Sequence, residues 1–390
     1  MSTSTVRDVV RHERKAYRKA SKSGKRRILD ELGKLTGYHR ESLARMLRDD
    51  GPPKKGPIRR PRAKKYERIL PQLKVLWAAA FYACGKRLAP FLPELLSALV
   101  RFGEISVTPH EELLLLSISP ATIDRMFMKE RATMKIRGRT LTKPGTLLRS
   151  KIPIRTFAEW NEKEPGFFEL DLVGHCGGSG AGEFLYTLNM TDVFSGWIAL
   201  GGMRGRGEKG TLDAMKSASR LIPFGVKGID SDNDSAFINW HMDKYLGQKK
   251  IKFTRCRPYK KNDQCHVEQK NPCGSYDWSV VRQFIGYRRY ETDEQLAVLG
   301  EIYPLIMRYH NFFSPMMRLR DKQRIGSKVT KRYMEAITPY RKLLTDGGHI
   351  SENTKERLRV QYEVTNPAEL LRQIRALSRR LESLPNPGDR

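Results

Sequence analysis

Three acidic residues have the types and the spacing that metal-dependent chemistry requires. Asp171 lies between two leucines in an apolar run, where a carboxylate is costly to bury unless it binds a cation or another partner. Asp232 and Glu268 have 35 residues between them. Converging carboxylates suit hard divalent cations such as Mg²⁺ or Mn²⁺. Two such ions, about 3.5–4 Å apart, can activate an attacking oxygen and stabilise a leaving oxygen in phosphoryl displacement. Taken alone, each acid is better explained as a cap, a turn residue or an ion-pair member. The second position stays open, because Asp230 and Asp234 flank Asp232.

The segments that carry these acids predict a mixed sheet flanked by helices. Alternating apolar residues and glycine-rich turns indicate three consecutive strands, and helices then alternate with two further strands. Asp171 would lie within the first strand, Asp232 just past the end of the fourth, and Glu268 on a helix. The expected strands are 167–173, 184–192, 197–200, 226–230 and 251–256, and the expected helices are 208–221, 237–246 and a stretch from about residue 262.

The charge distribution indicates a polyanionic partner. The 390 residues include 73 Lys and Arg against 43 Asp and Glu, a formal net charge of +30. Residues 1–155 carry +22, residues 156–310 carry zero and residues 311–390 carry +8. Polyanion binding is therefore expected at the two ends of the chain. The five cysteines fit a reducing compartment better than a disulfide framework. No apolar run of about 18 residues and no signal-peptide core is present, so we expect a cytoplasmic protein without a membrane span.

Residues 1–50 are predicted to hold a helix-turn-helix. Two apolar stripes, at 28–32 and 43–47, are separated by Gly33 and Gly37. In that arrangement His39, Arg40, Ser42 and Arg45 would face a DNA groove. A plain helical hairpin with solvated arginines explains the pattern almost as well.

Basic linkers and a second helical domain follow. Residues 51–65 contain prolines that prevent a helix, so we expect an extended segment that follows phosphates; its basic residues are Lys54, Lys55, Arg59, Arg60, Arg62, Lys64 and Lys65. A solvated spacer is the alternative. Residues 66–130 read as helical, with Ser119 as N-cap and Pro120 as first residue of a second recognition helix. Thr122 and Arg125 would lie on its outer face. Residues 131–155 read as another basic linker.

The motifs in the central block resemble a known family. Phe-Glu-Leu-Asp171, Ser231-Asp232-Asn233 and Val267-Glu268-Gln-Lys270, with the 35-residue spacing, resemble the DDE signature of retroviral integrases and related bacterial insertion-sequence transposases. Thr191-Asp192-Val-Phe-Ser resembles a stretch on the second strand of that family. Two departures concern the loop after the fourth strand: Asp234 stands where the family often has glycine, and Ala236 where it often has Glu.

The resemblance implies both a fold and an activity. Residues 156–310 would form an RNase H-like DDE catalytic core in which Asp171, Asp232 and Glu268 hold two Mg²⁺ (or Mn²⁺) ions. Such a polynucleotidyl transferase cuts one strand at each transposon end, and the freed 3′-hydroxyl attacks target DNA during DNA integration and recombination. It implies double-stranded DNA as partner, a dimer or higher oligomer on DNA, and a bacterial, nucleoid-associated protein. Lys260, Lys261 and Lys270 would hold phosphates near the site, or form a solvated face.

The remaining segments carry weaker signals. Residues 311–390 resemble the basic tail after the core of bacterial members, and 352–385 read as one helix whose leucine stripe packs on the core or on another subunit. His175, Cys176, Cys265, His266 and Cys273 lack the paired spacing of a zinc site. The glycine-rich segment 177–182 reads as a flexible turn rather than a phosphate-binding loop.

Two other functions use the same features. A non-catalytic DNA-binding regulator could keep the fold without the chemistry, although the intact acids argue against it. An RNase H-like nuclease for structured or hybrid nucleic acid shares the core, but the basic helical N-terminus favours sequence-specific binding of duplex DNA. We therefore expect a DNA transposase.

Overall fold

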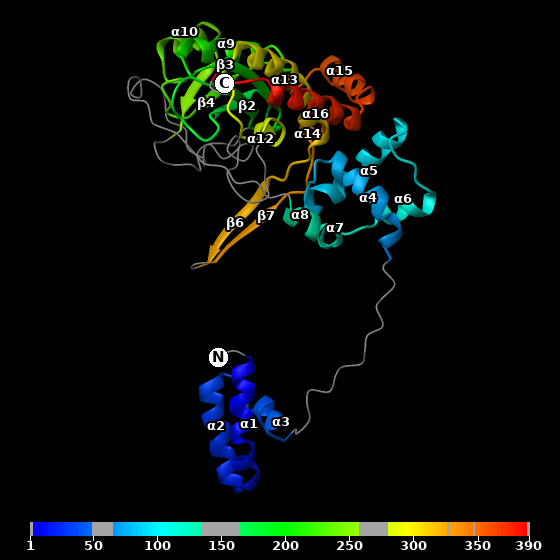
Figure 1. Cartoon of the computed structure of the whole chain (residues 1–390), viewed down its shortest axis with the longest axis vertical. Coiled ribbons are helices and arrows are strands. Elements are labelled where there is room, and N and C mark those ends of the chain that lie inside the picture. Colours follow the sequence, from blue (N-terminus) through cyan, green and yellow to red (C-terminus); the bar gives the residue numbers. More distant parts are fainter. Residues whose placement is uncertain are drawn as a thin grey trace. The chain divides into compact units, whose positions relative to one another are not determined.

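The protein consists of two compact units, Met1–Lys65 and Tyr66–Arg390, each with its own apolar core (Figure 1). The computed structural model describes residues 3–48, 65–133, 164–256, 280–325, 328–345 and 348–387. Among these residues, no helix is both long and apolar enough to cross a lipid bilayer.

The N-terminal unit is a bundle of three helices, α1 (Thr3–Lys19), α2 (Lys22–Thr36) and α3 (Arg40–Arg48). Gly37 ends α2 in the left-handed conformation (φ 75°), and only three residues separate α2 from α3. The sequence predicted the stripes of α2 and α3 but not α1, whose apolar residues recur at helical spacing. The core consists of Val6, Val10, Tyr17, Leu29, Leu32, Leu43 and Leu47.

The second unit begins with a short 3₁₀ turn, η1 (Glu67–Ile69), and five helices. They are α4 (Leu70–Ala79), α5 (Gly85–Arg101), α6 (Pro109–Leu116), α7 (Pro120–Met126) and α8 (Met128–Thr133). The ring of Trp77 stacks on Phe127 at 4.0 Å. Gly85 lies so close to Pro120 that an added Cβ would come 2.0 Å from the Pro120 carbonyl oxygen, so only glycine allows this crossing of α5 and α7.

The centre of the second unit is a five-stranded mixed sheet in the order β3-β2-β1-β4-β5. The strands β1 (Phe167–Gly174), β2 (Leu185–Asp192) and β3 (Ile198–Arg204) form an antiparallel meander. The strands β4 (Gly228–Ser231) and β5 (Lys252–Arg255) join parallel to β1. This arrangement confirms the mixed sheet and the strand order in sequence that the alternating pattern predicted.

Helices cover both faces of this sheet. Two adjacent glycines on β3 allow α9 (Glu208–Ser219) and α13 (Asp293–Phe313) to approach closely from opposite sides. A Cβ at Gly201 would lie 2.5 Å from the Ala214 carbonyl oxygen on α9, and one at Gly202 would lie 2.8 Å from Leu296 on α13. The helix α10 (Trp240–Gln248) contacts α9 and β5, and α12 (Val280–Ile285) contacts α13.

The C-terminal part contains a separate hairpin and three helices. The hairpin strands are β6 (Leu319–Ile325) and β7 (Lys328–Tyr333), and the helices are α14 (Pro339–Thr345), α15 (Glu352–Glu363) and α16 (Pro367–Ser383). The continuous helix predicted over 352–385 is wrong, because Asn366 caps a new helix by accepting hydrogen bonds from the amides of Ala368 and Glu369. The leucine stripe of α16 packs on α13 and also touches α4 and α5, so it is covered by its own chain.

Three ion pairs join α5 and the residues after it to the C-terminal helices. Glu94 pairs with Arg341 of α14, at 2.8 Å, and Arg101 pairs with Glu363 of α15. Glu104 pairs with Arg372 of α16 at 2.6 Å. In the core below them, the Tyr309 hydroxyl on α13 donates to the carbonyl of Ala79 at 2.7 Å. The helices α4–α8 and the sheet are therefore parts of one body.

Candidate active site and nucleic-acid surfaces

The central strands bring two of the three predicted acids together. In the parallel pairing of β1 with β4, Leu170 lies opposite Ser231. The same register, continued by one residue, sets Asp171 beside Asp232, with both side chains on one face of the sheet. On the next strand Asn189 is the partner of Asp171. This is the face that α13 packs against further along, at β3.

The electrostatics agree with this proximity. The pKa of Asp232 is raised to about 7, first by burial of the carboxylate and then by the negative charge of Asp171. The hydrogen bond from the Asp234 amide to Asp232 Oδ1 (2.9 Å) and the cationic Arg206 act in the opposite direction. The amide of Leu172 donates to Asp171 Oδ1 at 2.8 Å. Two adjacent carboxylates of this kind form a donor set that fits a hard divalent cation, whose charge would relieve their repulsion.

The two acids that flank Asp232 have other partners. Asp230 is wholly buried and accepts a hydrogen bond from the Thr254 hydroxyl at 2.6 Å. Asp234 accepts from Arg206 at 3.0 Å and from the amide of Ala236 at 3.0 Å. Asp234, which replaces the family's usual glycine, is thus a turn residue held by an ion pair. The negative charge of Asp171 raises the pKa of Asp232 more than the charge of Asp234 does.

The third acid cannot be compared with these two. Glu268 lies outside the described residues, as do Lys260, Lys261 and Lys270. Among the residues that are described, no three His, Cys, Asp or Glu side chains gather in a metal-binding group. Cys265, His266 and Cys273 also lie outside the described ranges, while His175 is fully buried with its Nε2 2.7 Å from the Thr187 hydroxyl.

The Asp-x-Phe-Ser stretch closes the turn between β2 and β3. Asp192 Oδ2 accepts hydrogen bonds from the amide (2.6 Å) and the hydroxyl (2.5 Å) of Ser195, and its Oδ1 accepts from the Gly166 amide at 2.8 Å. Burial raises the pKa of Asp192 to about 6 despite these bonds. Because Gly166 directly precedes β1, Asp192 fixes the start of the strand that carries Asp171.

Two residues near the sheet were missed by sequence reasoning. Arg206, in the loop after β3, pairs with Asp234 and lies close enough to Asp232 to lower its pKa. Asn311 of α13 donates to the Ile198 carbonyl (3.0 Å) and accepts from its amide (2.9 Å), so it satisfies the outer edge of β3. The Arg-Gly-Arg-Gly run and the Tyr-His-Asn run were visible, but their partners lie 28 and 113 residues away.

The glycine-rich loop between β1 and β2 is organised by a single arginine. The Arg289 guanidinium donates to the carbonyls of Ser179 (2.8 Å) and Ala181 (2.7 Å), and Gly177 and Gly182 have positive φ angles of 59° and 73°. The loop is therefore a turn between β1 and β2, as its sequence predicted.

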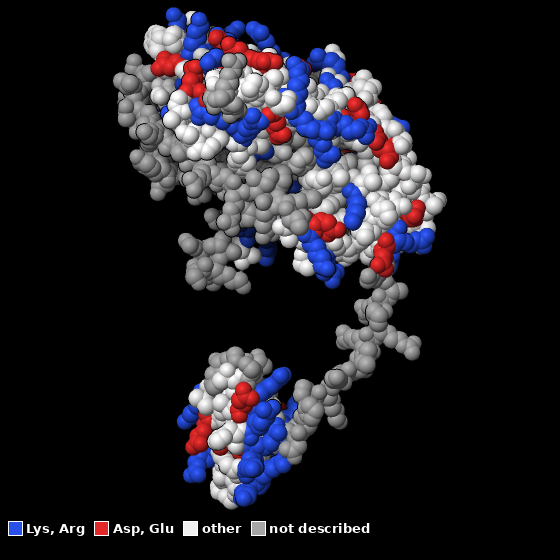
Figure 2. Space-filling view, in the orientation of Figure 1, with Lys and Arg blue, Asp and Glu red and all other residues white. Residues whose placement is uncertain are grey.

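The residues predicted to bind DNA lie on the surfaces of helices. Arg45 is exposed on α3, whereas Arg40 pairs with Asp30 of α2 at 2.5 Å and is partly neutralised. Figure 2 shows Lys and Arg side chains along the visible face of the N-terminal unit, with few acidic ones. On α7, Ser119 caps the helix as predicted, Arg125 is exposed and Thr122 is half-buried. Of the predicted linker residues, the structure describes Lys65 alone, which is exposed; Lys54, Lys55, Arg59, Arg60, Arg62 and Lys64 lie outside the described residues.

Comparison with known proteins gives three findings. Residues 161–261 match the Integrase core domain family. The chain is 36% identical over 340 residues to a protein of Sinorhizobium fredii named uncharacterized protein y4rM, covering 87% of this chain and 95% of that protein. It also resembles solved retroviral catalytic cores: HTLV-2 integrase in complex with magnesium (15% identity, 39% of this chain and 91% of that one, TM-score 0.29) and BIV integrase (16% identity, 49% and 98%, TM-score 0.28).

The family match over residues 161–261 and the five-stranded mixed sheet flanked by helices assign the central region an RNase H-like integrase core fold. The y4rM match extends over the helical flanks as well as the core. The chain therefore belongs to one family with the y4rM protein and, through its integrase core domain, to the integrase and transposase superfamily.

Proposed function

We propose that the protein is a DNA transposase that binds transposon ends, cuts one strand at each end and joins the freed 3′-hydroxyl to target DNA. The observation that supports the proposal is the pairing of Leu170 with Ser231 in β1 and β4, together with the charge interaction between the next residues, Asp171 and Asp232, within an integrase core domain. Glu268, at the family's spacing, is the proposed third member of the site.

The proposed chemistry assigns simple tasks to the residues of the chain. Asp171, Asp232 and Glu268 would hold Mg²⁺ or Mn²⁺, two ions per site, which supply charge neutralisation at the phosphate under attack. The amides of Leu172 and Asp234 orient the first two carboxylates through their hydrogen bonds. Water and then the freed 3′-hydroxyl would attack phosphorus in line. In each step the attacking oxygen forms a P–O bond as the bond to the leaving 3′-oxygen breaks, so no covalent enzyme intermediate is needed.

The helical parts would bind the DNA. Arg45 on α3 and Arg125 on α7 are exposed on helices that follow short turns, an arrangement that suits entry into the major groove. Arg40, Thr122 and the linker lysines and arginines would add contacts, and Lys260, Lys261 and Lys270 would hold phosphates near the acids. Synapsis of two transposon ends requires at least a dimer on DNA.

Strand transfer tests this proposal directly. The full-length protein is incubated with Mg²⁺ or Mn²⁺, a library of candidate end duplexes and supercoiled plasmid, and joined products are sequenced. We expect joining by the wild type and none by Asp171→Asn or Asp232→Asn. The matched control Asp213→Asn changes an exposed acid on α9 and should join normally.

Each rival predicts a different result. DNA binding without joining, unchanged by Asp232→Asn, would indicate a regulator. Degradation of RNA–DNA hybrids or branched DNA without joining would indicate a nuclease. Circular dichroism of each variant verifies that the fold is kept.

A further inference from the structure

The hairpin β6–β7 is rich in basic residues. Residues 318–333 contain seven Lys and Arg and a single acid, Asp321. The side chains of Arg320, Lys331 and Arg332 are exposed.

The hairpin gains little stability from the rest of the protein along its length. It forms a two-stranded sheet of its own, separate from the central sheet, and Figure 1 shows it projecting from the body. An isolated two-stranded hairpin is at best marginally stable in water. A hairpin with so many basic residues is therefore suited to a partner that supplies negative charge.

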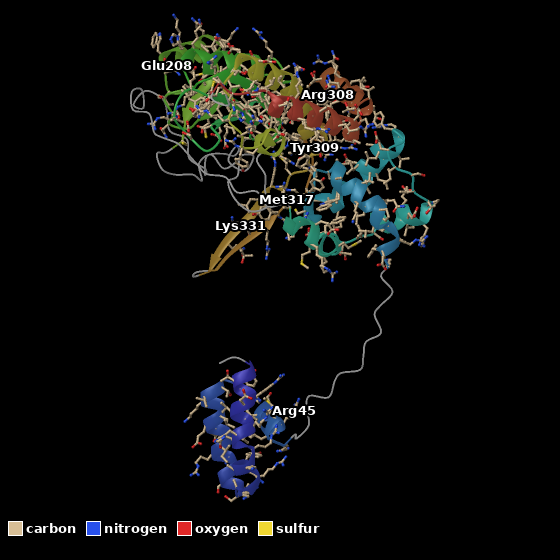
Figure 3. The ribbon with its side chains drawn as sticks, viewed as in Figure 1. Arg45, Glu208, Arg308, Tyr309, Met317 and Lys331 are labelled. Atoms are coloured by element: carbon tan, nitrogen blue, oxygen red, sulfur yellow. The ribbon has the colours of Figure 1, made fainter. Side chains whose placement is uncertain are left out.

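The root of the hairpin, by contrast, is firmly held. Met316 and Ile337 exchange backbone hydrogen bonds at 2.9 and 3.1 Å, and beyond them Phe312 of α13 packs edge-on against Tyr340 of α14. The guanidinium of Arg318 lies over the ring of Phe194, in the turn that Asp192 closes. Figure 3 shows Met317 at this root and Lys331 further out on the ribbon. The arm is thus oriented from its base, next to the sheet that carries Asp171.

We infer that β6–β7 is an arm that binds duplex DNA beside the catalytic sheet. A two-stranded ribbon has the width that the major groove admits, and its cations would meet the phosphates on the groove walls. Lys331 and Tyr333 lie on one face of β7 and Arg332 on the other, all exposed, so both faces offer contacts. This inference rests on the proposed function for the choice of DNA as the polyanion.

The salt dependence of DNA binding tests the inference without any chemistry. The full-length protein is titrated, in EDTA, into a fluorescein-labelled 40-base-pair duplex of random sequence and into duplexes that carry its element's ends. For Lys331→Gln/Arg332→Gln we expect binding about tenfold weaker or more at 0.1 M salt, and a slope of log K against log salt that is smaller by about 2.

Two controls separate position from charge. Lys331→Arg/Arg332→Lys keeps both charges on the hairpin and should bind as the wild type does. Lys244→Gln/Lys249→Gln removes two exposed charges from α10 and its end, and should change the slope by less. Weakening on the end duplexes alone would assign the arm to transposon ends, and weakening on both kinds of duplex to DNA in general.

Other outcomes overturn the inference. An unchanged slope for Lys331→Gln/Arg332→Gln would exclude the arm as a DNA contact. Unchanged DNA binding together with a loss of oligomers in sedimentation would make it a protein-docking arm instead. If the wild type binds DNA through the arm but never joins strands, the proposed transposase fails while the arm stands. If strand transfer proceeds and the hairpin variants bind normally, the arm fails and the transposase stands.

Discussion

At the scale of single residues, the sheet contains buried groups that resist protonation or ionisation. His175 is fully buried, with Nε2 bonded to Thr187 and its ring 5.6 Å from that of Tyr290. Burial lowers the pKa of His175 to about 3, and the nearby charge of Arg282 lowers it too. The folded protein therefore keeps this imidazole neutral at neutral and mildly acidic pH.

The neutral His175 makes stability sensitive to acid. The unfolded chain takes up a proton below about pH 6.5, whereas the folded chain does not until about pH 3, so folding loses free energy as the pH falls through this window. Between pH 7 and pH 5 this residue should account for about 2 kcal/mol of lost stability. In His175→Phe, the loss of unfolding free energy between pH 7 and pH 5, measured by urea denaturation, should be smaller than in the wild type by this amount.

The control for this experiment is His241→Gln, an exposed position on α10, which should retain the wild-type loss between pH 7 and pH 5. An equal loss in wild type and His175→Phe would mean that the pKa of His175 is the same in the folded and the unfolded chain.

At the scale of elements, side chains of α13 cover part of the β3 edge of the central sheet, Asn311 at Ile198 and Met307 at Leu200. Both the amide and the carbonyl of Ile198 on β3 are satisfied by Asn311, which is itself wholly buried. Edge strands with unsatisfied groups invite pairing with other chains, so this contact protects as well as stabilises.

Asn311→Ala should leave two buried backbone groups without partners. At about 1–3 kcal/mol for each, the expected loss of unfolding free energy is about 2–6 kcal/mol, with increased aggregation. Asn353→Ala, at an exposed position, is the control and should be near neutral. Urea midpoints and light scattering measure both effects, and a loss below 1 kcal/mol for Asn311→Ala would contradict this account.

The same elements show what sequence can and cannot predict here. The alternation around Leu170 and Leu188 and the helical spacing in α9 depend on nearest neighbours, so the strands and the positions of Asp171 and Asp232 were predictable. The break at Asn366-Pro367 was also visible in the sequence, yet the surrounding apolar stripe outweighed it. The contacts of Arg206, Asn311 and Arg289 join segments that are distant in the chain, and local pattern contains no information on them.

At the scale of the whole second unit, helix α16 connects the parts. Ile374 is fully buried on α16, which packs on α13 and reaches α4 and α5. The ion pairs of Glu94, Arg101 and Glu104 reinforce the same connection at its surface. Exposed pairs of this kind contribute little each, so most of the coupling comes from the apolar contacts.

Ile374→Ala should loosen the helices and the sheet together. A buried Ile to Ala change costs about 2–5 kcal/mol, and cooperative packing spreads that cost over the unit. Hydrogen exchange measured by mass spectrometry should accelerate by similar factors in peptides from α5 and from α13. Arg375→Ala, one residue further and exposed, is the control. Acceleration confined to α16 itself would show that the helical part and the core open independently.

The close crossing of α5 and α7 at Gly85 and the packing of the C-terminal helices α14–α16 have one further consequence. They place the outer face of α7, Asp171 on β1 and Asp232 just after β4 in one compact unit. If α7 binds a transposon end, the distance between the sequence that α7 binds and the scissile bond is fixed by the protein, so the cut falls a set number of base pairs from that sequence. When a few base pairs are inserted between the sequence that α7 binds and the normal cleavage position, the protein should cut at a different nucleotide. The distance in base pairs from the bound sequence to the cut should stay the same.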